Sequence, residues 1–347
     1  MTINFNNVYI KETSAVAGLL EKEGTFGKFY DKTYDNYYVG EKTFEQAEIK
    51  MIKESINIVL TKSKIKHDQI NVMLGSDLLN QLTANNYASN DLKFPYIGIY
   101  NACASMCAQY IVAGSLLQDK NINNVLLNLS SHNMTSERQF RNPVEYGCPR
   151  PKRSTYTVTG STSIILSKEK SDIKITSATI GTTTNMGVTD VYDMGSVMAP
   201  SCAETIYEHL KNTNTKVSDY DLIMTGDLGI YGKEILKEYL KEKYNIDLKD
   251  KLEDAGSIIY DRKKQENKVN AGGSGPVCLP LVINTYVLNQ LKEKKIKKVL
   301  LIATGALFSP TMNNQKLPIP SISHAICLEV LKWYLYIHLY FVVLFVL

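Results

Sequence analysis

Two stretches of the chain, HDQINVMLGSDLL at residues 67–79 and VSDYDLIMTGDLG at residues 217–229, follow the same pattern 150 residues apart. Each is an apolar run that ends in Ser or Gly and continues with Asp77 or Asp227 and then Leu. Each run follows apolar residues at helical spacing, which predicts the order helix, strand and aspartate-bearing turn. The helical positions are Ile49, Ile52, Ile56 and Val59 in the first case and Ala199, Ala203, Ile206 and Leu210 in the second.

A second pair of stretches repeats at an offset of 174. The sequence SLLQDKNINNVLLNLSSHN, from residue 115, matches NQLKEKKIKKVLLIATGAL, from residue 289, at its apolar positions. Two matches in the same order predict two halves of one architecture, residues 1–172 and 173–329, with an insertion in the second half. Alternating strands and amphipathic helices predict an α/β fold in layers, with mostly parallel strands buried on both faces.

The composition narrows the function classes. A chain of 347 residues, 44% apolar and 21% charged, is large enough to bury an extensive core. The net charge of +4 is spread along the chain and forms no basic stripe, which argues against nucleic acid as a partner. The six cysteines show neither a CxxC pair nor zinc-type spacing with histidine, and no secretory signal precedes them. We therefore expect reduced thiols in a cytosolic compartment, and neither a metal site nor a cofactor.

The stretch GIYNACASMCAQYIVAGSLL, residues 98–117, places Cys103 where an apolar strand turns into a helix. Sites in α/β folds form at the carboxyl ends of strands. The free amides at the start of a helix stabilise an anion or a thiolate. Cys103 is therefore a candidate for the floor of a binding site, for an inert packing residue or for a nucleophile. Cys107, one turn later, is expected in the core.

The repeated α/β plan with a cysteine at this turn resembles the thiolase-like fold, in which two pseudo-repeated halves form layers in the order α-β-α-β-α. Within that fold the chain resembles the stage V sporulation protein AD family, through motifs that extend to about Glu329. These motifs include FYDKTYD at 29–35, GSDLLNQ at 75–81, NACASM at 101–106, SSHNMTSERQFRNPVEYG at 130–147, DMGSVMAPSCAETI at 193–206, AGGSG at 271–275 and TGALFSPTMNNQKLPIPSISHAI at 304–326.

The resemblance implies a protein that is not an enzyme and that binds dipicolinic acid, pyridine-2,6-dicarboxylate, either free or as its calcium chelate. It implies a role in loading this compound into the developing spore, together with other membrane proteins of the same sporulation operon, and hence a link to germination. Synthesis on the cytoplasmic side and a peripheral position at the spore inner membrane follow from it. A homodimer is also expected, because thiolase-like folds commonly pair their sheets edge to edge.

The alternative is an acyl-thioester condensing enzyme of the 3-oxoacyl synthase or thiolase type with Cys103 as its nucleophile. Such an enzyme needs His and Asn, or a second His, to stabilise the enolate and to donate protons. By resemblance to 3-oxoacyl-acyl-carrier-protein synthase III, those positions fall at residues 225–227 and at Gly272 and Gly273, which carry neither side chain. Asp227 would repel an oxyanion, so only His324 remains as a substitute.

A planar dianion requires cationic or amide donors and flat apolar walls. The stretch after the strand NVLLNL offers Ser131, His132, Arg138 and Arg141. The two arginines are three residues apart, so they are expected to share a helical face and to contact the carboxylates, unless they pair with neighbouring glutamates. His132 is also open to interpretation as a hydrogen-bonded structural histidine.

Two further pairs of residues are candidates for the same site. Asp77 and Asp227 are expected to contact a calcium chelate of the ligand, because calcium prefers oxygen ligands, and otherwise to cap helices. Gly272 and Gly273 are expected to open the space that longer side chains occupy in the synthases.

The end of the chain departs from the family. The sequence VLKWYLYIHLYFVVLFVL, residues 330–347, contains fifteen mostly apolar residues from Trp333 onward, fewer than the about 20 that a membrane-spanning helix needs. This tail is interpreted as a short membrane anchor, as a buried terminal element or as the product of a disrupted reading frame.

Overall fold

The computed structural model describes residues 1–141 and 150–331. All but two of its strands form one large mixed sheet, in which two sets of five strands repeat the same order. The first set runs β5 (Tyr96–Gly98), β4 (Val72–Ser76), β6 (Asn124–Ser131), β8 (Gly160–Ser167) and β2 (Tyr9–Ala17). The second set runs β11 (Leu252–Asp254), β10 (Leu222–Thr225), β13 (Lys298–Ala306), β14 (Ser321–Val330) and β9 (Ile173–Ile180).

The strand directions repeat as well. In each set the first three strands are parallel, and the remaining two neighbour pairs are antiparallel. The sets join where β2 meets β9, at the pairing of Tyr9 with Lys174. Short strands β1 (Thr2–Asn4) and β3 (Lys32–Thr33) add to β9 and β2, and β7 (Tyr156–Thr157) pairs with β12 (Gly273–Ser274).

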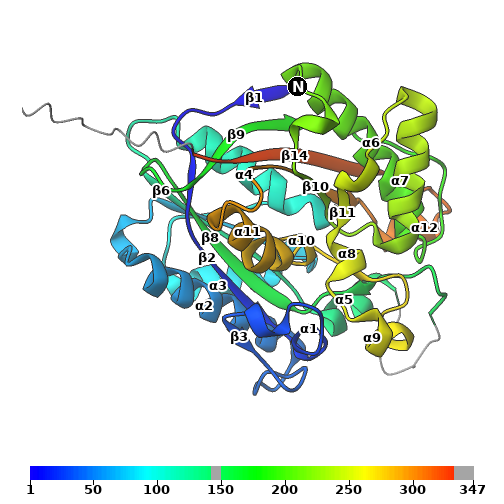
Figure 1. Cartoon of the computed structure of the whole chain (residues 1–347). Coiled ribbons are helices and arrows are strands. Elements are labelled where there is room, and N and C mark those ends of the chain that lie inside the picture. The colour runs from blue at the N-terminus through cyan, green and yellow to red at the C-terminus, as the bar shows by residue number, and fades with distance from the viewer. Residues whose placement is uncertain (142–149, 332–347) are drawn as a thin grey trace, which may run out of the picture.

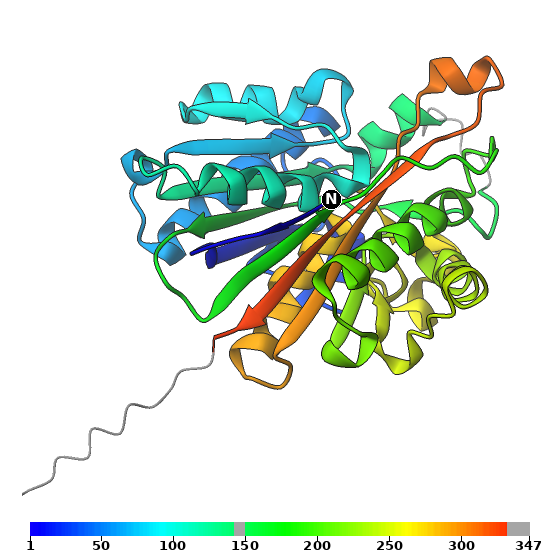
Figure 2. The same ribbon diagram turned by 90° about the horizontal axis from the view of Figure 1, so that it is seen from above.

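Helices complete five layers, the α-β-α-β-α order expected of the thiolase-like fold. The outer helices α2 (Phe44–Ser63) and α3 (Thr83–Leu92) cover the first set, and α6 (Met194–Thr213) and α7 (Gly229–Tyr244) cover the second (Figures 1 and 2). Between the sets lie α4 (Ser105–Leu116), α10 (Cys278–Val282) and α11 (Leu288–Lys292). The shorter helices are α1 (Leu19–Lys22), α5 (Asn133–Phe140), α8 (Ala255–Ile258), α9 (Arg262–Val269) and α12 (Pro310–Asn314).

The predicted sequence repeats correspond to repeated elements. Helices α2 and α6 both contain 20 residues and begin 150 positions apart, and each ends at a left-handed residue, Lys64 or Asn214. Strands β4 and β10 keep the same offset, and β6 and β13 begin 174 positions apart. The two strand sets therefore repeat one topology, as the thiolase-like plan predicts. Strand β9 begins at Ile173, and the division of the chain into residues 1–172 and 173–329 stays a prediction.

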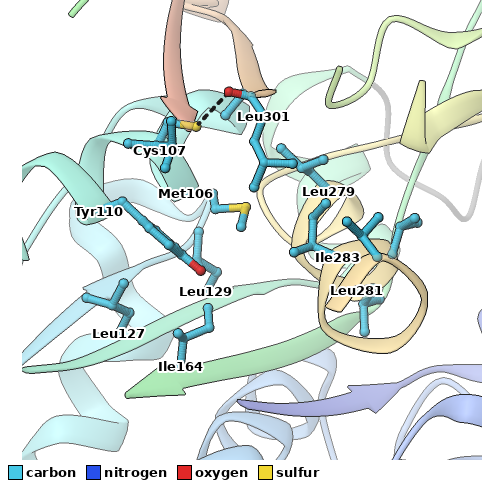
Figure 3. Packing of buried hydrophobic residues seen from close by; sticks show 14 of the residues in the cluster. Met106, Cys107, Tyr110, Leu127, Leu129, Ile164, Leu279, Leu281, Ile283 and Leu301 are labelled. Carbon is cyan, nitrogen blue, oxygen red and sulfur yellow. Dashed lines mark hydrogen bonds between the residues drawn. The ribbon is translucent and has the colours of Figure 1, made fainter. Parts of the chain in front are cut away.

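The central layer packs tightly between the two strand sets. Met106 and Tyr110 of α4 lie against Leu129 and Ile164 of the first set, while Cys107 points its thiol toward the Leu301 carbonyl of β13, 3.9 Å away (Figure 3). All of these side chains are buried. Cys107 is a core residue, as predicted.

The apolar stretch at 94–100 behaves differently from a buried strand. Only three residues pair, as β5, and β5 is the last strand of its set. Ile97 is 44% exposed and Tyr100 is 48% exposed. Ile97 and Tyr100 at this edge therefore do not belong to the hydrophobic core of the chain.

Within residues 1–141 and 150–331, no helix has the length and apolar character that crossing a membrane requires. The interpretations of the tail concern residues that, from 332 onward, lie outside the described part of the chain.

Candidate functional site

A pocket lies beyond the carboxyl ends of the parallel strands β4, β5, β10 and β13, where the sequence predicts a site. It has a volume of about 60 Å³, enough for several water molecules. Its polar wall comprises Cys103, Ser136, Arg141, Thr157, Asp227, Ser274 and Gly275. Its apolar wall comprises Leu78, Tyr100, Ala102, Phe140, Met194, Met198, Ala306 and Phe308.

A strained turn presents Cys103 to this pocket. Ala102 adopts a left-handed φ of 46°, an unfavourable conformation for a residue with a Cβ atom. Gly305 of β13 lies against the turn, and a Cβ atom there would come within 2.9 Å of the Ala104 nitrogen. Ser105 closes the turn, since its hydroxyl accepts from the Asn101 amide at 3.2 Å and donates to the Ala102 carbonyl at 2.7 Å. The half-buried Cys103 is therefore held at the start of α4 by its neighbours.

The side chain that faces Cys103 is a carboxylate. Asp227 accepts hydrogen bonds from the Thr304 hydroxyl at 2.5 Å, from the Gly275 amide at 3.2 Å and from the Cys103 thiol. Burial raises the pKa of Asp227 to about 6. Burial, and then the charge of Asp227, raise the pKa of Cys103 well above its usual range. The sulfur is thus held as a protonated thiol, whereas a nucleophile must be a thiolate.

His324, the expected substitute for a catalytic histidine, is engaged elsewhere. Its Nδ1 accepts from the Gly181 amide at 3.1 Å, and its Nε2 lies 2.7 Å from the side-chain amide of Asn101. Burial lowers the pKa of His324 to about 4, so the ring is neutral at pH 7. His324 is not one of the described residues that line the pocket.

Asp77 does not join Asp227 at the pocket, although the repeat gives them equivalent positions. Its carboxylate is buried and accepts from the Leu79 amide at 2.9 Å and from the Asn85 amide at 2.8 Å. Asn85 lies in the first turn of α3, so Asp77 caps this helix, the alternative role that the sequence allows. Burial raises the pKa of Asp77 to about 6.

Ser131 and His132 also serve the fold. The Ser131 hydroxyl donates to the Val158 carbonyl at 2.6 Å. His132 caps α5, because its Nδ1 accepts from the Met134 amide at 3.2 Å while Nε2 bonds the Tyr37 carbonyl at 2.7 Å. Burial lowers the pKa of His132 to about 4, which keeps the ring neutral. The structural interpretation of His132 matches these contacts.

The two arginines do not share a helical face. Arg138 is exposed and forms an ion pair with Glu45 of α2, away from the pocket. Arg141 lines the pocket with its side chain only 8% exposed. Its Nη1 lies 2.6 Å from Glu137 Oε1, and its Nε donates to the Val191 carbonyl at 3.2 Å. Of the two arginines that were expected to contact the ligand together, Arg141 lines the pocket and Arg138 does not.

Gly272 and Gly273 are not part of the pocket wall, so the prediction that they open its space is wrong. Gly272 has a φ of +124°, and a Cβ atom there would lie 2.2 Å from the Gly256 carbonyl oxygen. A Cβ atom at Gly273 would lie 2.7 Å from Ile259. Both glycines permit close backbone packing beside β12. The next two residues, Ser274 and Gly275, line the pocket instead.

The sequence reasoning missed most of the apolar wall and Ser136. Met194 and Met198 lie one turn apart at the start of α6, a helix whose position the repeat predicts. Tyr100 directly precedes the motif NACASM, and Phe308 follows β13. The sequence shows where strands end, and these ends indicate where a site forms. It does not show which of the side chains that follow a strand point into the pocket. Within residues 1–141 and 150–331, no group of three or more His, Cys, Asp or Glu is arranged to hold a metal ion.

Comparisons with known proteins agree with this architecture. The profile of the family described as stage V sporulation protein AD matches residues 1–329. The chain is 41% identical over 322 residues to stage V sporulation protein AD of Bacillus subtilis (strain 168), covering 93% of this chain and 94% of that protein. Among solved structures, 3-oxoacyl-[acyl-carrier-protein] synthase III from Aquifex aeolicus VF5 is 14% identical with a TM-score of 0.56, covering 93% of this chain and 99% of that one. A variant of Xanthomonas campestris OleA is 13% identical with a TM-score of 0.58, covering 94% and 97%.

Proposed function

This chain belongs to the stage V sporulation protein AD family, and we propose that it binds dipicolinate in the pocket between Cys103, Arg141 and Asp227. Membership of the family gives the protein a role in sporulation. The loading of dipicolinate into the developing spore is the function that the resemblance implies. The observation that carries the proposal is the buried guanidinium of Arg141, which shares the described wall of the pocket with the aromatic rings of Tyr100, Phe140 and Phe308.

The chemistry of the pocket matches a planar aromatic carboxylate. A guanidinium donates parallel hydrogen bonds to a carboxylate and remains charged at any physiological pH. Phe140 and Phe308, whose ring centroids are 5.8 Å apart, and Tyr100 offer flat apolar surface to a pyridine ring. Asp227 also lines the pocket. Its charge disfavours a carboxylate of the ligand beside it, unless a proton or the calcium ion of a chelate lies between the two groups.

The state of Cys103 supports binding rather than catalysis. In a condensing enzyme the cysteine forms a thioester, and a neighbouring histidine and a second His or Asn stabilise the enolate. Here the thiol donates to a carboxylate, which raises its pKa and lowers the thiolate fraction. We therefore propose a binding protein in which Cys103 contributes a small polarizable surface to the pocket floor.

An acyl-thioester condensing enzyme is the second candidate, because one of the similar solved structures is 3-oxoacyl-[acyl-carrier-protein] synthase III and because Cys103 directly follows the strained residue Ala102. Incubation with acyl-coenzyme A or an acyl-carrier protein, followed by mass spectrometry, tests it. An acyl adduct on the wild type that is lost in Cys103→Ala would favour the enzyme.

Calorimetric titration of dipicolinate, with and without calcium, tests the binding proposal. We expect Arg141→Ala to weaken binding by roughly tenfold to hundredfold, because a charge-assisted hydrogen bond contributes about 1.5–3 kcal/mol. Arg138→Ala is the matched control, since this arginine is exposed and pairs with Glu45. Cys103→Trp should abolish binding by filling the pocket, while Cys103→Ala should have a small effect. Absence of heat with the wild type, or equal losses in both arginine variants, would refute the assignment.

The partners and the location remain part of the proposal. We propose that the protein acts with other membrane proteins of the same sporulation operon, from a peripheral position at the spore inner membrane. We expect this protein to co-purify with those partners from a detergent extract of sporulating cells.

A further inference from the structure

Ser136 has an unexplained hydroxyl in the wall of the pocket. The residue is 3% exposed and lines the pocket from helix α5. Among the described residues its Oγ has no hydrogen-bond partner. Neighbouring Thr135, in contrast, donates to the His132 carbonyl at 3.0 Å and contacts Glu48. A buried hydroxyl without a partner is unfavourable, and this one lies in the wall of a pocket, where a bound ligand is able to accept its hydrogen bond.

Helix α5 places this hydroxyl beside the cationic group of the site. Ser136 and Phe140 lie one turn apart on the same face, and Arg141 follows at the end of the helix. All three line the pocket. Glu137, on the neighbouring face, holds Arg141 from within the protein and also lies 3.5 Å from Arg150. The guanidinium therefore has a fixed position relative to Ser136.

We infer that Ser136 and Arg141 bind the same carboxylate of the ligand, so that Ser136 is a specificity-determining residue of the site. The inference rests on the proposed function as a dipicolinate-binding protein. A carboxylate has two oxygens, one for the guanidinium and one for the hydroxyl. Rotation about the Cβ–Oγ bond of Ser136 lets its hydroxyl proton turn toward the pocket.

The charges of the other wall support this orientation of the ligand. Asp227, 1% exposed, carries its carboxylate on the side of Cys103 and Thr304. A ligand carboxylate near Asp227 meets a like charge, whereas one near Arg141 meets the net positive charge of Arg141 and Arg150, which share the carboxylate of Glu137. Ser136 adds a neutral donor on the favourable side, where it distinguishes a carboxylate from a cation or an apolar group.

The test compares Ser136→Ala with the wild type by thermal unfolding and by calorimetric titration with dipicolinate at pH 7. We expect dipicolinate to bind Ser136→Ala about tenfold to hundredfold more weakly, which corresponds to about 1.4–2.8 kcal/mol. The unfolding temperature should stay equal or rise, because the variant lacks an unpartnered buried hydroxyl. Thr162→Val is the matched control: its hydroxyl is also buried and unpartnered, and Thr162 lies in β8 outside the lining of the pocket. Its affinity should equal that of the wild type.

A second titrant, pyridine-2-carboxylate, separates this inference from the proposed function. If the wild type and Ser136→Ala bind dipicolinate equally, the inference falls and the proposed function stands. If the wild type binds pyridine-2-carboxylate but not dipicolinate, and Ser136→Ala weakens that binding, the inference stands and the dipicolinate assignment falls. Lack of binding of either compound overturns both. A fall in both unfolding temperature and affinity in Ser136→Ala would assign Ser136 a structural role and overturn the inference.

Discussion

At the scale of single residues, the contact between Cys103 and Asp227 sets the chemistry of the site. Thiolate formation is opposed by burial and by the negative charge of Asp227, whose carboxylate accepts a hydrogen bond from the protonated thiol. In a nucleophilic cysteine site the neighbour is a base or a cation that favours the thiolate. In this pocket the neighbour of Cys103 is a carboxylate, which favours the protonated thiol.

We predict that Cys103 reacts slowly with iodoacetamide at pH 8 and faster in Asp227→Asn. The asparagine removes the negative charge beside the sulfur and lowers the pKa of the thiol, which increases the thiolate fraction. Peptide mass spectrometry after timed labelling measures the rate at Cys103 alone. Asp77→Asn is the control, because Asp77 caps α3 and does not line the pocket. Equal rates in the wild type and Asp227→Asn would contradict the electrostatic account.

At the scale of elements, α5 connects stability with the site. The helix begins at a capped position, His132, and carries Ser136 within it and Arg141 at its end. Four of its eight residues are buried, although its composition is polar. Its orientation therefore depends on hydrogen bonds as well as on apolar packing.

We predict that His132→Ala lowers the free energy of unfolding by about 2 kcal/mol, since it removes the cap of α5 and the bond to the Tyr37 carbonyl, each worth about 1 kcal/mol. Ligand affinity should fall with it, because Arg141 and Ser136 lose their fixed position. His209→Ala is the control: this histidine is buried in α6 and bonds Thr179, far along the chain from α5. Denaturant unfolding and titration of both variants make the comparison. If both variants bind the ligand equally well, the cap has no influence on the site.

The elements also show what the sequence can and cannot predict. The offset of 150 predicts both helix–strand units because local periodicity and apolar burial decide them. The direction of Arg138 depends instead on Glu45 of α2, 93 residues away, and this contact is not a local property. Gly272 is small because the Gly256 carbonyl approaches it, a reason that lies in packing between distant segments. Cys103 was predictable as a site residue because a strand end and a helix start are both visible in the sequence.

At the scale of the whole molecule, β5 predicts self-association, because it is the last strand on its side of the sheet among residues 1–141 and 150–331. Ile97 on this strand and Tyr100 just after it are exposed side chains with large apolar surfaces. An unpaired, apolar edge strand is a template for pairing with another chain. We propose a homodimer through β5. Light scattering at micromolar concentration should show a dimer for the wild type and a monomer for Ile97→Asp, while Met312→Asp, an exposed apolar position elsewhere, should remain dimeric. A monomeric wild type would contradict the proposal.

The buried acids make the stability of the whole protein depend on pH. Burial raises the pKa of Glu21 to about 7, of Asp254 to about 7 and of Glu48 to about 8. A raised pKa means that the folded state holds protons that the unfolded state has released, so the free energy of unfolding falls as pH rises. The buried histidines, whose pKa values are lowered to about 4, act in the opposite direction, but only below about pH 6.5.

We therefore predict that the protein loses stability between pH 6.5 and 8, and that Glu48→Gln reduces this loss by up to about 2 kcal/mol. Glutamine cannot ionise, and its amide oxygen can still accept from the Ser130 hydroxyl, which lies 2.8 Å from the native carboxyl. Urea unfolding at several pH values measures the slope. Glu234→Gln, on the exposed surface of α7, should leave the slope unchanged. Parallel curves for the wild type and Glu48→Gln would show that Glu48 is not the group that titrates, because removal of an ionising acid must change the slope wherever that acid releases its proton.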